Sequence, residues 1–276
     1  MKPAAFDYVR IEDADEIFDA FDTYGEEARI LAGGQSLMAM LNFRLAQPRA
    51  LLDISRCENL NYVRIADGRL CVGAAATQAS VEWRGALARE VPLLALAFPS
   101  ISHFQIRNRG TVCGSIAHAD PSAELPLCLT ALGGDVVLRS RSRRRVLAAD
   151  AFFTGMLTTA IAPGEFIEEV RFPLAAAGRR YAFDEVSMRR GDFAIVAVAA
   201  IVADSEFTLA VGGVADRPVR AMWPALSEAD LVVAINDFAW ALQAQSDSHA
   251  SAQYRRHLVR ELGHELIVRA RDEKVR

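Results

Sequence analysis

Cysteine is scarce in this chain, and the four that occur, at positions 57, 71, 113 and 128, lack the close spacing that metal sites use. Zinc and iron–sulfur centres usually draw their thiolates from short repeats such as Cys-x-x-Cys. The sequence therefore predicts neither centre, and no metal ligand, in this chain. Isolated cysteines are typical of a reducing compartment, and no apolar stretch of the signal-peptide type follows the first residues. We therefore expect a cytoplasmic protein.

A positive charge excess and long apolar runs are also missing. The chain has 31 Lys and Arg against 35 Asp and Glu, whereas proteins that bind nucleic acids usually carry a basic excess. The longest strongly apolar run, residues 194–203, has ten residues, about half of a membrane span. We therefore expect no nucleic-acid partner and no membrane span, and a buried strand or helix explains the run. With 52% apolar residues, the composition excludes extensive disorder.

Hydrophobic periodicity predicts a crossover near the start of the chain and a change of structure after it. The first predicted elements are a helix over 13–24, which Asp13 can cap, and a strand over 29–32. A helix over 36–46, which ends before Pro48, and a strand over 51–54 follow. The strand, helix and second strand form a βαβ order. Small residues at 174–178 indicate a linker, and hence a domain boundary. The remaining predicted elements are strands at 70–74, 136–138, 146–147, 167–172, 194–202 and 207–211, and helices at 81–96, 226–243 and 249–270.

A first glycine-centred loop, Leu31-Ala32-Gly33-Gly34-Gln35-Ser36-Leu37, joins a predicted strand to a predicted helix. Glycines let the backbone come close to a ligand, and a helix start offers unpaired N–H groups to an anion. The loop therefore predicts a pyrophosphate site, with a tight turn capped by Ser36 as the alternative. Its spacing is not Gly-x-Gly-x-x-Gly and no Gly-Lys-Ser/Thr follows, which argues against Rossmann and P-loop sites.

A second loop, residues 105–121, holds more polar groups than a structural loop requires. The hydroxyls of Thr111 and Ser115 are candidates for phosphate binding, and the carboxyls of Asp120 and Glu124 are candidates for ribose binding. The alternative is a capped surface loop in which these acids and hydroxyls begin a helix.

Three stretches of the sequence carry a resemblance to a known family: AGGQSL at 32–37, RNRGTVCGSIAHADPSAELP at 107–126 and RRGDFA at 189–194. Together they resemble the FAD-binding medium subunit of the molybdenum hydroxylases, the relatives of carbon monoxide dehydrogenase and xanthine dehydrogenase. The resemblance implies an α+β protein. Residues 1–175 would form a two-lobed FAD-binding domain of the vanillyl-alcohol oxidase (PCMH) type, with lobes at about 1–56 and 57–175. Residues 176–276 would form a small domain of antiparallel sheet packed with helices.

The resemblance also implies the positions of FAD-binding residues. The two loops would hold the pyrophosphate, Asp120 and Glu124 would lie toward the adenosine, and Arg189 or Arg190 and Phe193 would lie near the isoalloxazine. No catalytic residue is predicted in this chain. The complete predicted set is Leu31, Ala32, Gly33, Gly34, Gln35, Ser36, Leu37, Ile101, Gly110, Thr111, Cys113, Gly114, Ser115, His118, Asp120, Glu124, Ile167, Arg189 and Phe193, where Ile101 and Ile167 would line the flavin or adenine pockets.

Two positions depart from the family pattern. Cys113 stands where relatives commonly have the first of two glycines, so it would be strained if the position requires a positive φ. A thiol beside a flavin also raises a redox or covalent role, although a buried cysteine more often behaves as a small apolar residue. Gln35 stands where several relatives carry His, which puts any flavin hydrogen bond attributed to that His in doubt.

The resemblance implies an electron-transfer subunit. Its FAD would accept electrons from a small 2Fe–2S subunit and pass them to an external acceptor, while a large molybdopterin subunit hydroxylates the substrate, in a heterotrimer or its dimer. Two alternatives stay open: a self-contained FAD-dependent oxidase or reductase of the same fold, and a binding module that has lost FAD.

Other motifs have simpler explanations. The five arginines of residues 139–145 fit an exposed hairpin turn, and docking of an acidic partner surface is the alternative. The helical run that includes His257 and Glu261 fits a solvated helix face. Phe152, Phe153 and Trp240 are expected in the core.

Overall fold

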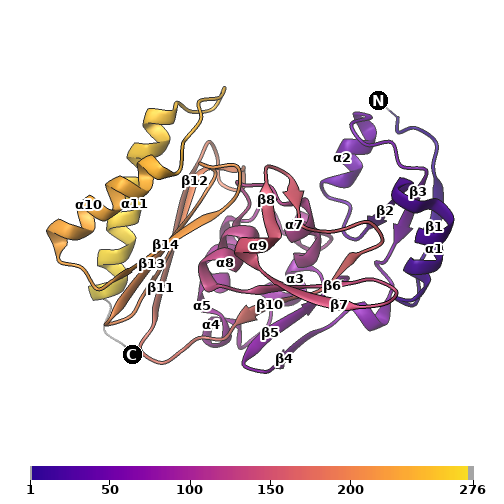
Figure 1. Ribbon diagram of the computed structural model, residues 1–276, viewed down its shortest axis with the longest axis horizontal. Helices are drawn as coiled ribbons and strands as arrows, with labels where there is room; N and C mark the ends of the chain where they lie inside the picture. The colour runs from indigo at the N-terminus through magenta and orange to yellow at the C-terminus, as the bar shows by residue number, and fades with distance from the viewer. Residues whose placement is uncertain (1, 273–276) are drawn as a thin grey trace.

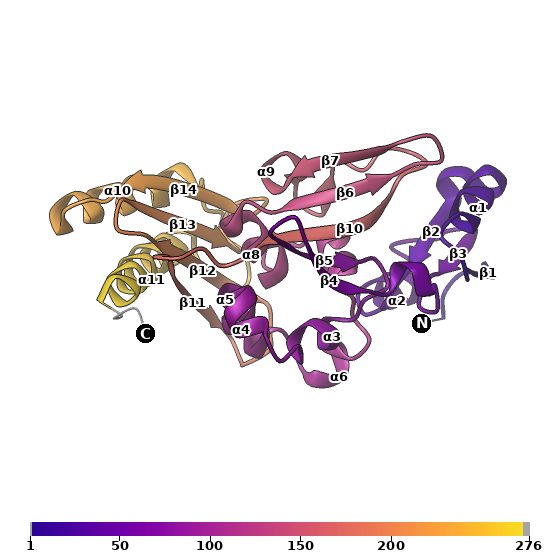
Figure 2. The same ribbon diagram turned by 90° about the horizontal axis from the view of Figure 1, so that it is seen from below.

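The computed structural model describes residues 2–272, and its three larger sheets lie side by side along the long axis of the molecule (Figure 1). Figure 2 shows the same order from below, with the N-terminal sheet at one end and the C-terminal sheet at the other. In the described part of the chain, no helix has the length and apolarity needed to cross a membrane.

The first sheet is parallel, in the order β1-β3-β2. The predicted order of helix, strand, helix and strand is confirmed for α1, β2, α2 and β3, and β1 was not predicted. Helix α1 begins at Glu16 and not at Asp13, and a turn precedes it in which the Asp13 carboxylate accepts the N–H of Asp15 at 2.8 Å. The Glu16 carboxylate accepts the N–H groups of Glu12 and Asp13. Helix α2 is shorter than expected, since Arg44 takes a left-handed φ of 56°. This N-terminal unit contains β1 (Asp7–Arg10), α1 (Glu16–Tyr24), β2 (Ala28–Leu31), α2 (Leu37–Asn42) and β3 (Ala50–Asp53).

The second sheet is antiparallel and has the order β4-β5-β10-β6-β7. The expected helix over 81–96 is wrong, because Pro92 has no N–H to continue a helix and begins a new one. The strands are β4 (Val63–Ala66), β5 (Arg69–Gly73), β6 (Asp135–Arg139), β7 (Arg144–Ala148) and β10 (Phe166–Pro173), and β8 (Phe153–Gly155) pairs with β9 (Thr158–Thr159) beside them. The helices are α3 (Gln78–Glu82), α4 (Leu87–Glu90), α5 (Pro92–Ala97), α6 (Phe104–Arg107), α7 (Val112–His118), α8 (Glu124–Leu132) and α9 (Ala149–Phe152).

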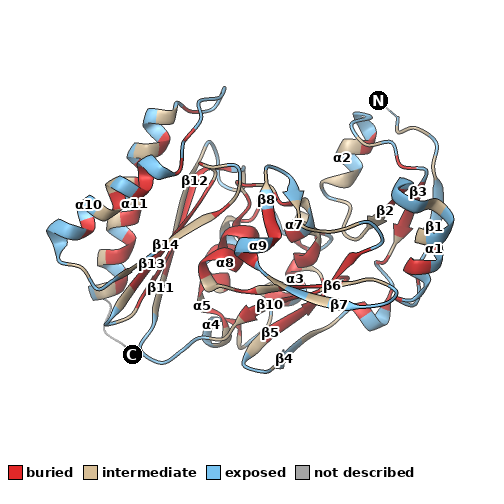
Figure 3. Ribbon diagram, in the orientation of Figure 1, coloured by how far each residue is buried: buried red, intermediate tan, exposed pale blue. Residues whose placement is uncertain are grey.

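The third sheet, β11-β12-β13-β14, is antiparallel and carries two long helices on one face (Figure 1). All nine residues of β12 are buried, because α8 covers one face of the strand and α11 covers the other (Figure 3). The apolar run at 194–203 is therefore a central strand. The elements are β11 (Arg180–Ser187), β12 (Ala194–Val202), β13 (Glu206–Gly212), β14 (Val219–Pro224), α10 (Glu228–Ala241) and α11 (Ala252–Asp272).

Two of the three aromatic residues expected in the core lie there. Phe152 and Phe153 are buried and stack edge to face at 5.2 Å between ring centroids. Trp240 is instead 58% exposed, and the guanidinium of Arg256 lies 4.2 Å above its ring. The prediction for Trp240 was wrong because a tryptophan on a surface helix can cover its ring with an arginine side chain.

Candidate functional site

The two glycine loops touch each other through their backbones. A Cβ atom on Gly33 would lie 2.2 Å from the carbonyl oxygen of Arg109 and 2.6 Å from the Cα of Gly110. Carbon atoms do not approach backbone that closely, so only glycine fits. A Cβ atom on Gly114 would lie 3.9 Å from that of Ala32. The structure thus brings together loop 32–36 and loop 109–115, which are far apart in the sequence.

Hydrogen bonds fix the second loop against the segment before α3. The N–H of Gln78 donates to the carbonyl of Gly110 at 2.7 Å, and the N–H of Val112 donates to Ala76 at 3.3 Å. Thr111 is the N-cap of α7, because its Oγ1 accepts the N–H of Gly114 at 2.9 Å. Its hydroxyl proton stays available to a ligand. The alternative explanation, in which hydroxyls of this loop cap a helix, is therefore correct for Thr111. Because Thr111 caps the helix as an acceptor, its hydroxyl can still donate a hydrogen bond.

The conformation of the first loop is fixed by its own residues. Gly34 has a φ of +73°, which favours glycine, and the side-chain amide of Gln35 donates to the carbonyl of Gly33 at 2.9 Å. Ser36 occupies the N-cap position of α2, but its side chain makes no capping hydrogen bond there. Gln35 therefore has a structural role, and the Ser36 hydroxyl is left for another partner.

A cavity of about 330 Å³ lies against the first loop. Three of the residues that line it are absent from the predicted set: Met38 in α2, Asp53 at the end of β3 and Arg109 beside Gly110. Burial opposes ionisation of Asp53, yet hydrogen bonds from the Tyr8 hydroxyl and from Ser55 keep the pKa of its carboxyl below the usual value. The position of Asp53 at the carboxyl end of a parallel strand was a usable signal. The remaining lining residues are Leu31, Ala32, Gly33, Gly34 and Gln35.

Cys113 is a buried residue of α7. Its φ is not among the positive values of the chain, so the cysteine carries no strain of that kind. It is buried, its Sγ lies 3.4 Å from the carbonyl oxygen of Val72, and burial raises the pKa of the thiol. A thiolate does not form readily in such surroundings.

We expect Cys113 to resist alkylation in the native protein. All four cysteines are free and buried, so maleimide labelling should stay near zero until denaturant is added, and Cys113→Ser should retain full flavin content. The measurement is mass spectrometry of labelled peptides. Rapid native labelling of the peptide that contains Cys113 would revive the redox role.

Glu124 begins α8 and is buried with no cation paired to it in the described residues. Burial raises the pKa of its carboxyl to about 8, and the nearby carboxyl of Glu185 on β11 adds to the shift. Burial also raises the pKa of Glu185 to about 7. Asp120 is not a helix cap, because its carboxylate accepts the N–H of Ser122 in a local turn. His118 ends α7.

The other predicted residues are not among those that line this cavity. Ile101 is buried after α5, and Ile167 is buried in β10 opposite Leu138. Arg189 and Phe193 lie between β11 and β12 on the surface. Phe193 is 67% exposed, and the guanidinium of Arg189 pairs with Asp192 at 3.1 Å.

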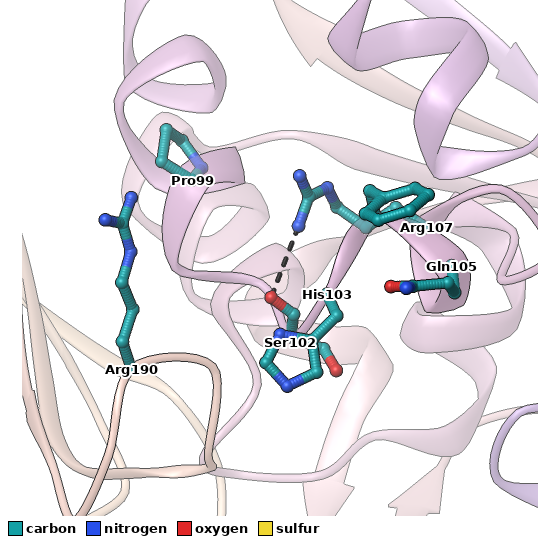
Figure 4. A pocket seen from close by; sticks show the side chains of 7 residues that line it. Pro99, Ser102, His103, Gln105, Arg107 and Arg190 are labelled. Carbon is teal, nitrogen blue, oxygen red and sulfur yellow. Dashed lines mark hydrogen bonds between the residues drawn. The ribbon is translucent and has the colours of Figure 1, made fainter.

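The connection between β11 and β12 packs on the segment before α6. A Cβ atom on Gly191 would lie 3.0 Å from the carbonyl oxygen of Ser102. Arg107 holds that segment from within, since it pairs with Glu82 at 2.7 Å and donates to the carbonyl of Ser102 at 3.3 Å (Figure 4). A second cavity, of about 400 Å³, lies here and is lined by Pro99, Ser102, His103, Phe104, Gln105, Arg107 and Arg190 (Figure 4).

Comparisons with known proteins identify the family of this chain. The family of FAD-binding domains in molybdopterin dehydrogenases matches residues 4–175. The 6-hydroxypseudooxynicotine dehydrogenase complex subunit alpha of Paenarthrobacter nicotinovorans is 35% identical, with 98% of this chain and 96% of that protein covered. The glyceraldehyde dehydrogenase medium chain of Sulfolobus acidocaldarius is 34% identical over 95% of this chain and 97% of its own length.

Solved structures of similar proteins have the same fold. Reconstituted CO dehydrogenase from Oligotropha carboxidovorans has a chain that superposes with a TM-score of 0.94 at 28% identity, covering 99% of this chain and 100% of its own. Quinoline 2-oxidoreductase from Pseudomonas putida 86 has a chain with a TM-score of 0.91 and 31% identity, and 98% of each chain is covered.

The fold, with its two facing glycine loops, is that of a flavoprotein with an FAD-binding domain of the PCMH type. The chain belongs to the FAD-binding medium subunits of the molybdenum hydroxylases, the family that includes the carbon monoxide and xanthine dehydrogenases. Its cofactor is FAD, and its class is that of the oxidoreductases. The predicted family, fold class and cofactor are confirmed.

Proposed function

We propose that this chain takes electrons from a 2Fe–2S partner subunit and passes them to an external acceptor, as the electron-transfer subunit of a molybdenum-containing hydroxylase. The observation that carries the FAD site is the contact between Gly33 and the backbone of Arg109 and Gly110, which brings the two loops together beside a cavity lined by the first loop and Arg109. Bound FAD exchanges electrons singly or in pairs, which suits a link between one-electron and two-electron partners.

Residues of the two loops fit an FAD pyrophosphate. The Ser36 hydroxyl has no capping bond and the Thr111 hydroxyl keeps its proton, so both can donate to phosphate oxygens. Arg109 adds a positive charge next to Gly33 and Gly34. Glu124 would accept hydrogen bonds from ribose hydroxyls, while Arg189 and Phe193 would lie toward the isoalloxazine.

The partners in this proposal are a small 2Fe–2S subunit and a large molybdopterin subunit, in a heterotrimer or its dimer in the cytoplasm. The names of the relatives support such an assembly, because they include a complex subunit alpha, a caffeine dehydrogenase subunit beta and carbon monoxide dehydrogenase medium chains. A division into domains at 174–178, with lobes meeting near residue 56, is part of the same proposal.

The test is to purify the complex through a tag on this chain. We expect a flavin spectrum, FAD on acid release from this chain, and iron–sulfur absorbance and molybdenum in the subunits that co-purify. Flavin reduction by a substrate with this chain alone would support the self-contained oxidase or reductase instead. A chain that retains no flavin in any form would contradict the proposal.

We expect Arg109→Met to weaken FAD binding by roughly 5- to 30-fold, which corresponds to the 1–2 kcal/mol typical of a partly exposed charge-assisted hydrogen bond. Arg109→Lys should retain most of the affinity, because it keeps the charge. The measurement is flavin fluorescence during titration of the apoprotein, with Arg179→Met, in the exposed 174–179 connection, as the control. Equal affinities for all variants would remove Arg109 from the site.

A further inference from the structure

The arginine-rich hairpin between β6 and β7 is fastened to helix α1. The guanidinium of Arg141 donates to Asp19 at 2.7 Å and to Asp22 at 2.9 Å. Arg139 pairs with Asp15 at the start of α1 and with Glu168 on β10 at 3.3 Å. Both views show the hairpin reaching across to α1 (Figures 1 and 2). These two arginines thus find acidic partners within the chain, and the proposed docking of an outside acidic surface loses its main support.

An apolar contact lies beneath the ion pairs. Phe18 is 4% exposed and packs on Phe166 of β10, with 5.7 Å between ring centroids. The guanidinium groups of Arg139 and Arg141 lie 5.3 Å and 5.7 Å from the centre of the Phe18 ring. Phe18 shares one face of the helix with Asp15, Asp19 and Asp22, because residues spaced by three, four and seven project the same way. A single stripe of α1 therefore meets the hairpin.

This contact joins the unit that carries the first loop to the sheet on which the second loop packs. Helix α1 packs on β2 and β3, and β2 leads directly into Gly33. The hairpin extends from β6, which pairs with β10, and α7 of the second loop packs on β10. Holding α1 against the hairpin therefore holds the N-terminal unit, with its loop, against the sheet that carries the other loop.

We propose that Arg139 and Arg141 are positioning residues for FAD, which preset the separation of the two glycine loops before the cofactor binds. The proposal rests on the proposed function, since it assumes that FAD lies between these loops. A ligand that binds two preassembled surfaces does not have to pay for ordering them. An exposed ion pair by itself contributes little. The effect is therefore expected from the set of pairs over the Phe18 ring and is expected to fall with added salt.

The experiment compares FAD affinities of full-length apoproteins at low salt. Arg141→Glu places a third negative charge beside Asp19 and Asp22, and we expect FAD affinity to fall about 5- to 20-fold, with a smaller fall at 0.5 M salt. The triple variant Arg141→Glu, Asp19→Arg, Asp22→Arg restores opposite charges on the hairpin and α1, and it should recover most of the affinity for FAD. Hydrogen exchange should be faster in α1 of apo Arg141→Glu than in wild type.

As a matched control, the FAD affinity of Arg143→Gln is compared with that of Arg141→Gln. Arg143 lies on the same hairpin but faces Glu165 at 3.6 Å, and Glu165 keeps its closer partner Arg145 at 2.6 Å. We expect Arg143→Gln to bind FAD as wild type does and Arg141→Gln to bind it more weakly.

Three outcomes would overturn the proposal. Wild-type affinity in Arg141→Glu would show that the contact does not position the loops. Equal losses in Arg141→Gln and Arg143→Gln, or no recovery on charge reversal, would show a general weakening of the hairpin. If the wild-type apoprotein itself binds no FAD, the proposed function fails. Hydrogen exchange in α1 of Arg141→Glu then still shows whether the arginines hold the helix against the hairpin.

Discussion

Replacing Gly33 by alanine is expected to remove FAD from the protein, with a loss of affinity of more than about 100-fold, or 2.7 kcal/mol. The added Cβ would lie 2.2 Å from the Arg109 carbonyl oxygen and 2.6 Å from the Gly110 Cα. Both atoms are backbone, and hydrogen bonds from Gln78 and Val112 hold that backbone in place. The two loops must therefore move apart, and the pyrophosphate would lose one of its two surfaces. The measurement is flavin content after purification, followed by titration of the apoprotein with FAD.

Gly85→Ala is the matched control, because a Cβ there meets nothing within 4 Å. It should keep wild-type flavin content. Gly33→Ala will also cost some stability, so circular dichroism must show that the variant is folded at the titration temperature. A folded Gly33→Ala protein with a full complement of FAD would mean that the cofactor does not depend on the contact between the loops.

The crossover at the N-terminus was predictable because local signals agree there. Short apolar runs, a Gly-Gly break and the position of Pro48 all indicate strand, loop, helix and strand in that order. The first loop was found for the same reason, since it lies where the strand stops. The structure adds that Gly33 is required by a neighbour about 75 residues away, which no local pattern contains.

Long-range contacts explain what sequence analysis missed. The arginines at 139–145 look alike in the sequence, yet Arg141 reaches α1 while Arg145 pairs with Glu165. Arg109 was overlooked because its place beside Gly33 follows from the packing of α6 and α7 and not from spacing. The strands β11 and β14 lie at the two edges of their sheet and mix polar and apolar residues, so their sequences show only a weak strand pattern.

The buried carboxyl of Glu124 is expected to make the apoprotein less stable as pH rises. Its pKa is about 8 in the folded chain, against an ordinary value of 4.5. Between these two pH values the folded state keeps the proton and the unfolded state releases it. The free energy of unfolding therefore falls from about pH 4.5 to pH 8, and this group adds no further change above that range. A shift of this size corresponds to roughly 3–5 kcal/mol.

Replacing Glu124 by glutamine should flatten much of this slope, because the amide does not ionise. The slope should not vanish, since the raised pKa of Glu185, about 7, acts with the same sign. Chemical denaturation of the apoprotein from pH 5 to 9 measures the effect, and Glu26→Gln, at an exposed position, should leave the slope unchanged. An equal slope in wild type and Glu124→Gln would show that the carboxyl does not hold a proton in the folded state.

In the proposed FAD complex, we expect cofactor binding to depend on the same proton of Glu124. If ribose hydroxyls donate to this carboxyl, they stabilise its ionised form and lower its pKa in the complex. Binding then releases a proton, so the affinity of wild-type protein for FAD should increase as pH rises from 6 to 8, and that of Glu124→Gln should stay nearly constant. Titration calorimetry in two buffers of different ionisation enthalpy counts the released proton directly. Proton release that is equal in both proteins would place the ribose away from Glu124 while leaving the pyrophosphate site intact.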